Sequence, residues 1–257
     1  MSPSSPPREV TAAVLIIGNE VLSGRTRDQN LPFLAEQLNA VGVRVREARI
    51  IADDEDAIVA AVNACRAAFD YVFTTGGIGP THDDITSAAI AKAFGVALVR
   101  DPEAEARLLR HYRPDEVNAA RLKMADVPEG AVLIDNPVST APGMQVENVF
   151  VLPGVPAIMR AMFDGLRHRL MGGAPMRSRT ISAFTTEGRI AAPLAAIQTA
   201  HASVEIGSYP FARYGRFGVS LVIRGVDPAA VDAATEAVRA LLIGDGTEPI
   251  EDEAAVP

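Results

Sequence analysis

The sequence predicts an α/β protein, in which a layered domain around a mostly parallel sheet is followed by a smaller α+β domain. Two observations predict this class. From residue 12 to about residue 170, short apolar runs alternate with segments whose apolar residues recur every three or four positions, as strands alternate with helices. Strands separated by helices pair in parallel, because a tight hairpin cannot connect them. Beyond residue 175, the pattern changes to that of strands with one buried face.

The first elements follow from local patterns. Residues 12–18 form a continuous apolar run, as expected for a strand that is buried on both faces. Apolar residues at helical spacing predict helices over 31–41 and 58–69. Further apolar runs predict strands over 43–51 and 71–75, so the chain opens in the order β-α-β-α-β.

The same reasoning extends the first domain to about residue 170. A helix is expected to begin near Asp84, where apolar residues again take helical spacing. The elements predicted after it are a strand at 96–99, a polar stretch over 101–126 that is helical in two pieces broken at Pro114, strands at 131–134 and 149–154, and a helix over 158–170.

A linker and a change of period mark the second domain. The stretch "MGGAP" at 171–175 cannot continue a helix, because it holds two glycines and a proline. Strands at 180–184 and 217–225 and a closing helix over 231–241 indicate a small α+β domain in the order β-α-β-β-α. The predicted organisation is a disordered tail at 1–9, a first domain at 10–171, a second at 172–244 and an acidic disordered tail at 245–257.

Composition excludes several classes of protein. The chain has 257 residues and a formal net charge of −8, which argues against the broad basic surface of a nucleic-acid-binding protein. Cys65 is the only cysteine, so neither an intrachain disulfide nor a cysteine-based zinc site is expected. No stretch approaches the roughly 20 apolar residues that cross a bilayer, and the N-terminus lacks the apolar core of a signal peptide. We therefore expect a cytoplasmic protein that does not enter a membrane.

The stretch "TTGGIGPTHDDIT" at 74–86 is the strongest candidate site. It lies where a predicted parallel strand ends and a helix follows, which is where ligands bind in open α/β sheets. Gly76, Gly77 and Gly79 leave backbone N–H groups bare, and the start of the helix adds further donors, so a phosphate or pyrophosphate fits this corner.

Two adjacent acids in the same motif indicate a cation. Asp83 and Asp84 would repel phosphate unless a hard divalent metal such as Mg²⁺ lay between them. The alternative is a capping interaction, because Thr81 and Asp84 have the spacing of a capping box. That alternative leaves Asp83 and the three glycines unexplained. His82, in the same motif, is either a ligand or an ordinary solvated histidine.

Two further strand ends are expected to face the same crevice. The segment "GNEVLSGRTRDQN" at 18–30 is predicted to be a polar loop, and "LPGVP" at 152–156 places Gly154 directly before a helix. The alternative for either segment alone is a plain β-α turn. Three polar or glycine-rich strand ends in one sheet favour a binding site.

These motifs resemble the N-terminal region of the competence/damage-inducible protein A (CinA) family. The matching stretches are "IGNEVLSGRTRDQN" at 17–30, "DDE" at 53–55, "FTTGGIGPTHDDIT" at 73–86, "NPVSTAPGM" at 136–144 and "VLPGVPAIM" at 151–159. The resemblance implies the three-layer molybdopterin-binding domain shared with MoaB and Mog proteins, which binds a pterin or nucleotide that carries phosphates. It also implies a small KH-like domain after this one and a homodimer or homotrimer.

The resemblance implies two activities. CinA-type proteins are associated with metal-dependent hydrolysis of the pyrophosphate in ADP-ribose-like compounds, and Mog proteins adenylylate molybdopterin in molybdenum cofactor biosynthesis. A non-catalytic nucleotide sensor is a third alternative. Larger family members continue into a nicotinamide-nucleotide amidohydrolase domain, and because this sequence stops at 257, no deamidase activity is expected. The family often has Asp where this chain has Asn19, which removes one possible metal ligand.

Residue roles carry over by position. The resemblance assigns phosphate or nucleotide binding to Gly76, Gly77, Gly79, Thr81, Thr86, Ser139, Pro142 and Gly143. The polar or glycine-rich strand ends add Asn19, Ser23, Asn30 and Gly154 as binding candidates. It assigns a divalent metal, Mg²⁺, Mn²⁺ or Co²⁺, to Asp83, Asp84 and Glu20, and Glu20 is also a candidate general base. The chemistry implied is attack of water on phosphorus.

The stretch "SYPFARYGRFG" at 208–218 interleaves arginines with aromatic residues, as in proteins that stack nucleic-acid bases. It is predicted to be a hairpin between two strands, whereas the G-x-x-G loop of a KH domain joins two helices. A plain turn, a lid or a subunit contact is therefore the preferred interpretation, and nucleic acid is not expected as a partner.

Overall fold

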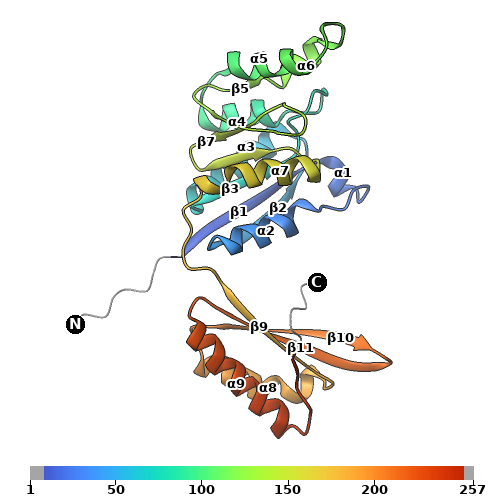
Figure 1. Cartoon of the computed structure of the whole chain (residues 1–257), viewed down its shortest axis with the longest axis vertical. Coiled ribbons are helices and arrows are strands. Elements are labelled where there is room, and N and C mark those ends of the chain that lie inside the picture. The colour runs from blue at the N-terminus through green and yellow to red at the C-terminus, as the bar shows by residue number, and fades with distance from the viewer. Residues whose placement is uncertain (1–8, 252–257) are drawn as a thin grey trace, which may run out of the picture. The chain divides into compact units, whose positions relative to one another are not determined.

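The computed structural model describes residues 9–251, and it divides the chain into two compact units, Met1–Gly173 and Ala174–Pro257 (Figure 1). Residues 1–8 of the predicted N-terminal tail and 252–257 of the predicted C-terminal tail lie outside the described residues. Glu9, which was assigned to the N-terminal tail, is described and forms ion pairs with Arg44 and Arg46. Within 9–251, the helices are all too short or too polar to span a membrane.

A six-stranded sheet forms the centre of the first unit, in the order β2-β1-β3-β8-β7-β6. Its strands are β1 (Val10–Ile17), β2 (Val43–Ile51), β3 (Tyr71–Thr75), β6 (Val132–Ile134), β7 (Gly143–Val146) and β8 (Val149–Leu152). The first four strands of that order pair in parallel, and β7 runs antiparallel to both of its neighbours. The predicted mostly parallel sheet is confirmed. The short β7–β8 hairpin was not predicted.

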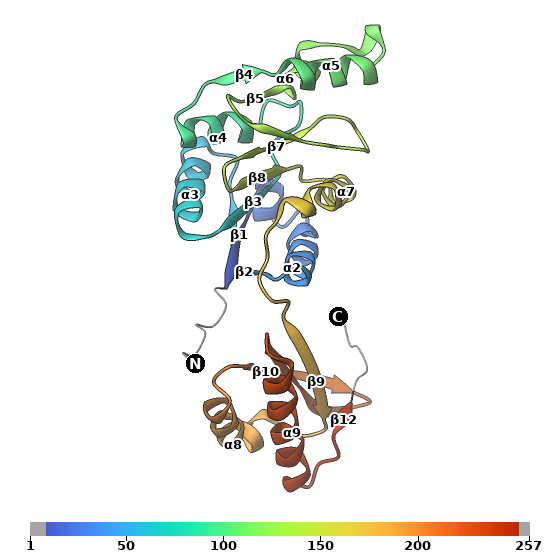
Figure 2. The same cartoon turned by 60° about the vertical axis from the view of Figure 1, so that its left-hand side comes forward.

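Helices cover both faces of this sheet, which gives the three layers (Figures 1 and 2). Alternate residues of β1 face opposite layers and are all buried: Ala12, Val14 and Ile16 pack with α2 (Asn30–Ala40) and α7 (Pro156–Leu166). Ala13, Leu15 and Ile17 pack with α3 (Glu55–Ala68) and α4 (Thr86–Phe94). Burial on both faces explains why β1 is apolar from Ala12 to Ile17.

An excursion between α4 and β6 carries small elements. They are β4 (Leu98–Arg100), α5 (Pro102–His111), a 3-10 turn at Pro114–Glu116, α6 (Ala119–Lys123) and β5 (Asp126–Pro128). The break at Pro114 is as predicted, because proline fits the first turn of a helix and not its interior. A four-residue helix, α1 (Asn19–Leu22), occupies part of the segment 18–30 that was predicted to be a loop.

The second unit is a small α+β domain, as predicted. Its elements are β9 (Arg177–Ala183), α8 (Glu187–Ala200), β10 (Glu205–Arg213), β11 (Arg216–Gly225), α9 (Pro228–Gly244) and β12 (Ile250–Glu251). They form an antiparallel sheet in the order β10-β11-β9-β12. The β-α-β-β-α-β order is that of the ferredoxin-like motif, which refines the expected KH-like topology.

The acidic tail predicted at 245–257 is wrong for its described part. Asp245 accepts a hydrogen bond from Thr185 and pairs with Arg189 at 2.8 Å. Ile250 and Glu251 form a strand against β9, and Glu251 pairs with Arg239. Backbone pairing and ion pairs order this segment despite its low apolar content.

Candidate functional site

A pocket of about 530 Å³ lies at the carboxyl ends of β1, β3 and β8. This is the edge at which open α/β sheets bind ligands. The lining residues come from the three strand ends, the loop between β6 and β7 and the end of α6: Glu20, Thr26, Gly76, Gly77, Ile78, Gly79, Pro80, Asp84, Met124, Asn136, Ser139, Ala141, Pro153, Gly154, Val155, Pro156 and Ile158.

The loop after β3 requires glycine at two positions. Gly76 and Gly77 have φ angles of 106° and 68°, in the left-handed region that side chains disfavour. A Cβ atom at Gly76 would lie 2.1 Å from the carbonyl oxygen of Ile17, and one at Gly77 would lie 2.2 Å from the Thr86 Oγ1 atom. Space and conformation therefore both exclude a side chain, and the bare backbone of this loop forms part of the pocket wall.

Thr86 holds the glycine loop against helix α4. Its side chain is fully buried, and its hydroxyl donates a hydrogen bond of 3.0 Å to the carbonyl oxygen of Gly76. Its backbone N–H donates to the carbonyl oxygen of Gly77, also at 3.0 Å. The hydroxyl proton that was expected to contact a phosphate is thus used within the loop.

Asp84 makes the capping-type interaction that was the alternative to a metal role. Its Oδ2 atom accepts hydrogen bonds from the Thr81 backbone N–H at 2.7 Å and from the Thr81 hydroxyl at 2.5 Å. The same carboxylate lies against Gly79, where a Cβ atom would approach it to 2.7 Å. Asp84 therefore shapes the loop, while still contributing to the pocket wall.

Asp83 points elsewhere. Its side chain is exposed and is absent from the pocket lining. Hydrogen bonding from Thr81 and from its own backbone N–H lowers its pKa below the ordinary value, and the charges of His82 and Lys123 act in the same direction. The adjacent acids of the motif thus occupy two different environments.

The acids do not build a metal site by themselves. Among residues 9–251, no three aspartate, glutamate, histidine or cysteine side chains are grouped as metal ligands. Glu20 and Asp84 are the two acids that line the pocket. Mg²⁺ commonly takes only one or two carboxylates and completes its shell with water and substrate phosphates. The donor set therefore fits an ion shared with a bound phosphate, and not a closed protein site.

The remaining predicted residues fall into two groups. Ser139 and Gly154 line the pocket, together with the three glycines already described. Asn19 and Ser23 are absent from the pocket lining: the backbone N–H of Asn19 donates to the Asp53 carboxylate, and the Ser23 hydroxyl donates to the carbonyl oxygen of Glu20. Asn30 is buried and donates to the carbonyl oxygen of Gly154 at 2.9 Å, which ties α2 to the loop before α7.

Pro142 and Gly143 were expected to form a wall of the site, but they are not among the residues that line the pocket. Gly143 begins β7 and pairs with Ile134, and a Cβ atom there would lie 2.5 Å from the carbonyl oxygen of Val151. Pro142 immediately precedes this strand. Tight packing between β7 and β8 thus accounts for the glycine.

Asn136 organises the wall opposite the glycine loop. Its Nδ2 atom donates to the Ser139 hydroxyl and to the carbonyl oxygen of Ala141, both at 2.8 Å. Its Oδ1 atom accepts from the backbone N–H groups of Val138 and Ser139 at 3.0 Å. Asn136 was not predicted as a site residue, although it lies in the matching stretch at 136–144.

Lys123 was also missed. Its Nζ atom donates to the carbonyl oxygen of Thr81 at 2.8 Å, which places a positive charge beside the glycine–aspartate loop. Lys123 lies in a polar helix some 40 residues beyond the motif, and its sequence context gives no signal for this contact.

Comparison with known proteins matches both units. Residues 13–171 match the family described as "Probable molybdopterin binding domain", and residues 175–250 match "FAD synthase, middle domain". In structure, the first unit resembles the CinA protein of unknown function from Thermoplasma acidophilum, with 37% identity, a TM-score of 0.59, and coverage of 62% of this chain and 96% of that one.

Relatives in sequence carry three descriptions. A "Probable FAD synthase" of Caenorhabditis elegans is 34% identical over 93% of this chain and 51% of its own length. A "CinA-like protein" of Desulfosudis oleivorans is 41% identical over 67% of this chain and 45% of its own length. A relative from Archaeoglobus fulgidus, described only as a protein, is 34% identical over 89% of this chain and 96% of its own length.

The chain spans about half the length of the first two of these relatives. The family match covers more than half of the chain, and it coincides with the three-layer unit that carries the pocket. The chain therefore belongs to the molybdopterin-binding-domain family, and it is a CinA-like member of that family.

Proposed function

We propose that the pocket binds a small molecule that joins a flat ring to a phosphate or diphosphate, namely a nucleotide or a pterin. The observation that carries the proposal is the glycine loop after β3, whose backbone is bare at Gly76 and Gly77. The Gly76 N–H donates to the carbonyl oxygen of Leu152, so the anion would be held by the N–H groups that follow, from Gly77 to Gly79. Successive backbone N–H groups in such a loop form a concavity that suits an anion. The following helix, α4, places its positive end at the same loop.

The other walls suit a ring. Apolar side chains of Ile78, Met124, Val155 and Ile158 line the pocket together with prolines, and polar groups are confined to a few positions. Ligand sites of 300–1,000 Å³ usually have this division between an apolar lining and a few orienting polar groups. A pocket of about 530 Å³ has the size of a nucleotide or pterin site.

We further propose hydrolysis of an ADP-ribose-like dinucleotide at this site. Water attacks one phosphorus atom of the diphosphate, the bond from that phosphorus to the bridging oxygen breaks, and AMP and ribose 5-phosphate leave. Glu20 is the candidate base, because its carboxylate lines the pocket beside the glycine loop. Asp84 would hold a divalent ion, Mg²⁺, Mn²⁺ or Co²⁺, together with the ligand phosphates, and the ion would neutralise charge on the diphosphate. The alternative role of Glu20 is to complete the shell of this ion, in which case Glu20→Gln would weaken binding as well as turnover.

FAD is a second candidate ligand. Residues 175–250 match the middle domain of FAD synthase, and a relative over 93% of this chain is named probable FAD synthase. FAD contains the same adenosine diphosphate group as ADP-ribose, so the same loop would bind its phosphates. Adenylyl transfer to a pterin, and ligand binding without turnover, are the other functions that the test must separate.

The test measures binding and turnover together. Calorimetric titration with ADP-ribose, FAD and a pterin is run on the wild type and on Gly77→Ala, and product release is followed by chromatography with Mg²⁺, Mn²⁺, Co²⁺ or a chelator. We expect the wild type to bind at least one of these ligands and Gly77→Ala to bind none of them. Glu20→Gln should lower the rate of turnover at least a hundredfold and keep the ligand affinity of the wild type. If a ligand binds but is not turned over under any metal condition, the proposed hydrolysis is excluded and the proposed ligand binding stands. Absence of binding by all three ligands would remove the proposed function itself.

A further inference from the structure

The sheet of the second unit has one face that its helices do not cover. Both α8 and α9 lie on the same face of this sheet (Figure 2). Val219, Leu221 and Ile223 of β11 are fully buried on that face. Residues alternate between faces along a strand, so Arg216, Gly218, Ser220 and their cross-strand partners lie on the other face.

Rings and arginines form a connected cluster on this open face. Phe184 follows β9 and meets Phe211 of β10 edge to face, with ring centroids 5.7 Å apart. The guanidinium of Arg216 lies over the Phe184 ring at 4.2 Å, and that of Arg213 lies over the Phe211 ring at 4.9 Å. Tyr209, two residues before Phe211 on the same face, is 48% exposed.

Glycines allow these rings to lie against the sheet. A Cβ atom at Gly218 would lie 2.3 Å from the Phe211 ring, and one at Gly207 would lie 2.8 Å from the Tyr209 ring. Both rings therefore rest on glycine backbone, in the way that aromatic residues cover glycines on sheets. Rings laid against a sheet present flat surfaces, and guanidinium planes stacked on rings extend those surfaces.

The charge of this face opposes that of the whole chain. The open face of β10 and β11 carries Arg213, Arg216 and Arg224 against Glu205, while the chain has a net charge of −8. The open face is thus locally positive, although the net charge of the chain is negative. A second copy that presented the same face would set its arginines against these arginines, which disfavours a face-to-face dimer.

We propose that this face, defined by Phe184, Tyr209, Phe211, Arg213 and Arg216, binds single-stranded nucleic acid. Bases stack on the rings and guanidinium planes, and the arginines contact phosphates. Aromatic side chains on open four-stranded sheets recognise single strands in this way, because every base offers a π-face. The expectation from sequence, that nucleic acid is not a partner, depended on net charge and on the G-x-x-G context, and neither reveals an uncovered face.

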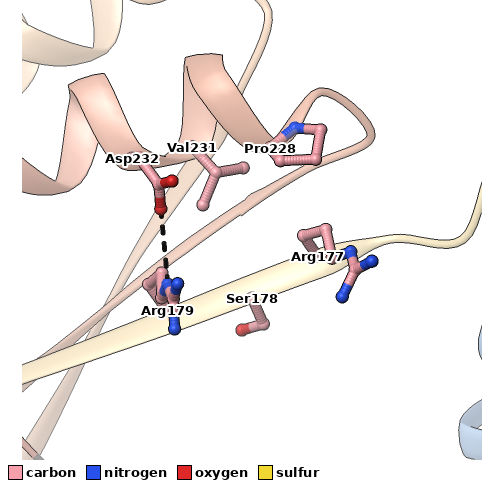
Figure 3. A pocket seen from close by; sticks show the side chains of 6 residues that line it. All are labelled: Arg177, Ser178, Arg179, Pro228, Val231 and Asp232. Carbon is pink, nitrogen blue, oxygen red and sulfur yellow. Dashed lines mark hydrogen bonds and ion pairs between the residues drawn. The ribbon is translucent and has the colours of Figure 1, made fainter.

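The other face supplies a matched control. Arg179 of β9 lies on the helix-covered face and pairs with Asp232 of α9 at 3.4 Å (Figure 3). Arg177, Ser178, Pro228 and Val231 complete the shallow pocket at this position. Arg179→Ala and Arg216→Ala each remove one positive charge, and only Arg216 belongs to the stacking cluster.

The experiment is fluorescence anisotropy of labelled 15-nucleotide RNA and DNA strands with the full chain at 50 mM and 300 mM salt. We expect labelled single strands to bind saturably. Unlabelled duplex DNA and AMP should each need at least a tenfold higher concentration than unlabelled single strand to displace them. Tyr209→Ala and Phe211→Ala should each weaken binding about fivefold or more, the lower range for one stacked base. Arg216→Ala should weaken binding by a similar factor, and Arg179→Ala should change the affinity less than twofold. The logarithm of the binding constant should fall with the logarithm of the salt concentration, with a slope of about −0.7 for each phosphate contacted.

Several results would overturn the proposal. The proposal fails if no strand binds at 50 mM salt, if Arg179→Ala and Arg216→Ala weaken binding equally, or if AMP displaces the labelled strand as well as an unlabelled strand does. It also fails if sedimentation shows that the wild type is a dimer which Tyr209→Ala and Phe211→Ala dissociate, because the face would then be a subunit interface. Because Tyr209 is half-exposed, Tyr209→Ala should unfold at the same midpoint temperature as the wild type. This variant therefore tests the proposal even if Phe211→Ala unfolds the second unit. Binding of nucleotides at the first unit is measured separately, with Gly77→Ala, which should leave strand binding unchanged.

Discussion

The buried hydroxyl of Thr86 donates a hydrogen bond of 3.0 Å to the carbonyl oxygen of Gly76, and so fastens the glycine loop to helix α4. Thr86→Val keeps the shape of the side chain and leaves that carbonyl oxygen without this donor. We expect a loss of about 1–3 kcal/mol in the free energy of unfolding, the usual cost of an unsatisfied buried polar group. Urea denaturation measures it. Thr86→Ser retains the hydroxyl and should recover most of the loss; equal stability of the valine variant and wild type would contradict the assigned role.

Gly77 should tolerate no side chain. Gly77→Ala places a Cβ atom 2.2 Å from the Thr86 Oγ1 atom, at a φ angle of 68°. Gly95, which ends α4, has a φ angle of 67° and open space around it, so Gly95→Ala has the same backbone strain without the clash. We expect Gly95→Ala to cost about 1 kcal/mol of stability, as for a residue forced into the left-handed region, and to leave ligand affinity unchanged.

The comparison of these two alanine variants is made by calorimetry with ADP-ribose and by thermal melting. Gly77→Ala should lose both affinity and stability. If the two variants lose affinity equally, the glycine loop has no specific part in binding.

Asp83 should stabilise the fold only above acidic pH. Its pKa is lowered in the folded state by hydrogen bonding from Thr81 and from its own backbone N–H, so the folded chain binds a proton there less tightly than the unfolded chain. The contribution is therefore present above the ordinary pKa of 3.8 and is lost as pH falls through the lower folded value. The stability difference between wild type and Asp83→Asn should shrink between pH 6 and pH 3. A difference that grows on acidification would have the wrong sign.

Tyr214 should be replaceable with a gain in stability. It has a φ angle of 53° at the tip of the β10–β11 hairpin, and its side chain is 97% exposed. Asparagine adopts this conformation more readily, so Tyr214→Asn should raise the free energy of unfolding by about 0.5–1 kcal/mol. Chemical denaturation measures the change, and Phe217→Asn, exposed at the start of β11 without a positive φ angle, is the control. A destabilised Tyr214→Asn variant would mean that the tyrosine ring packs on the hairpin.

Local patterns were enough to predict most of the first unit. The strands β1 and β3 are apolar over most of their length because neighbouring strands and helices enclose them, and that burial is visible in the sequence. The strand β2 lies at the edge of the sheet and alternates apolar with charged residues, which also predicts a strand. The hairpin of β7 and β8 was missed because its two-residue turn is Glu147-Asn148, with a positive φ angle at Glu147, and lacks the Asn-Gly or Asp-Gly pair that usually signals such a turn.

The location of the candidate site could be predicted from the sequence, but most of the contacts that its side chains make could not. The glycines and the strand ends located the pocket, since both are local features of the chain. Spacing alone could not decide whether Asp84 turns toward a ligand or toward Thr81, because both arrangements need an acid three residues after a threonine. Contacts between distant segments, such as Lys123 with Thr81 and Asn30 with Gly154, depend on the tertiary fold.

The central claim is that the backbone of the loop after β3 binds phosphate, and nuclear magnetic resonance tests it most directly. In a ¹⁵N-labelled chain titrated with ADP-ribose, the amide resonances of Gly77, Ile78 and Gly79 should shift and saturate together, with the same dissociation constant as calorimetry. Saturable binding that leaves these three amides unmoved while resonances elsewhere shift would contradict the claim.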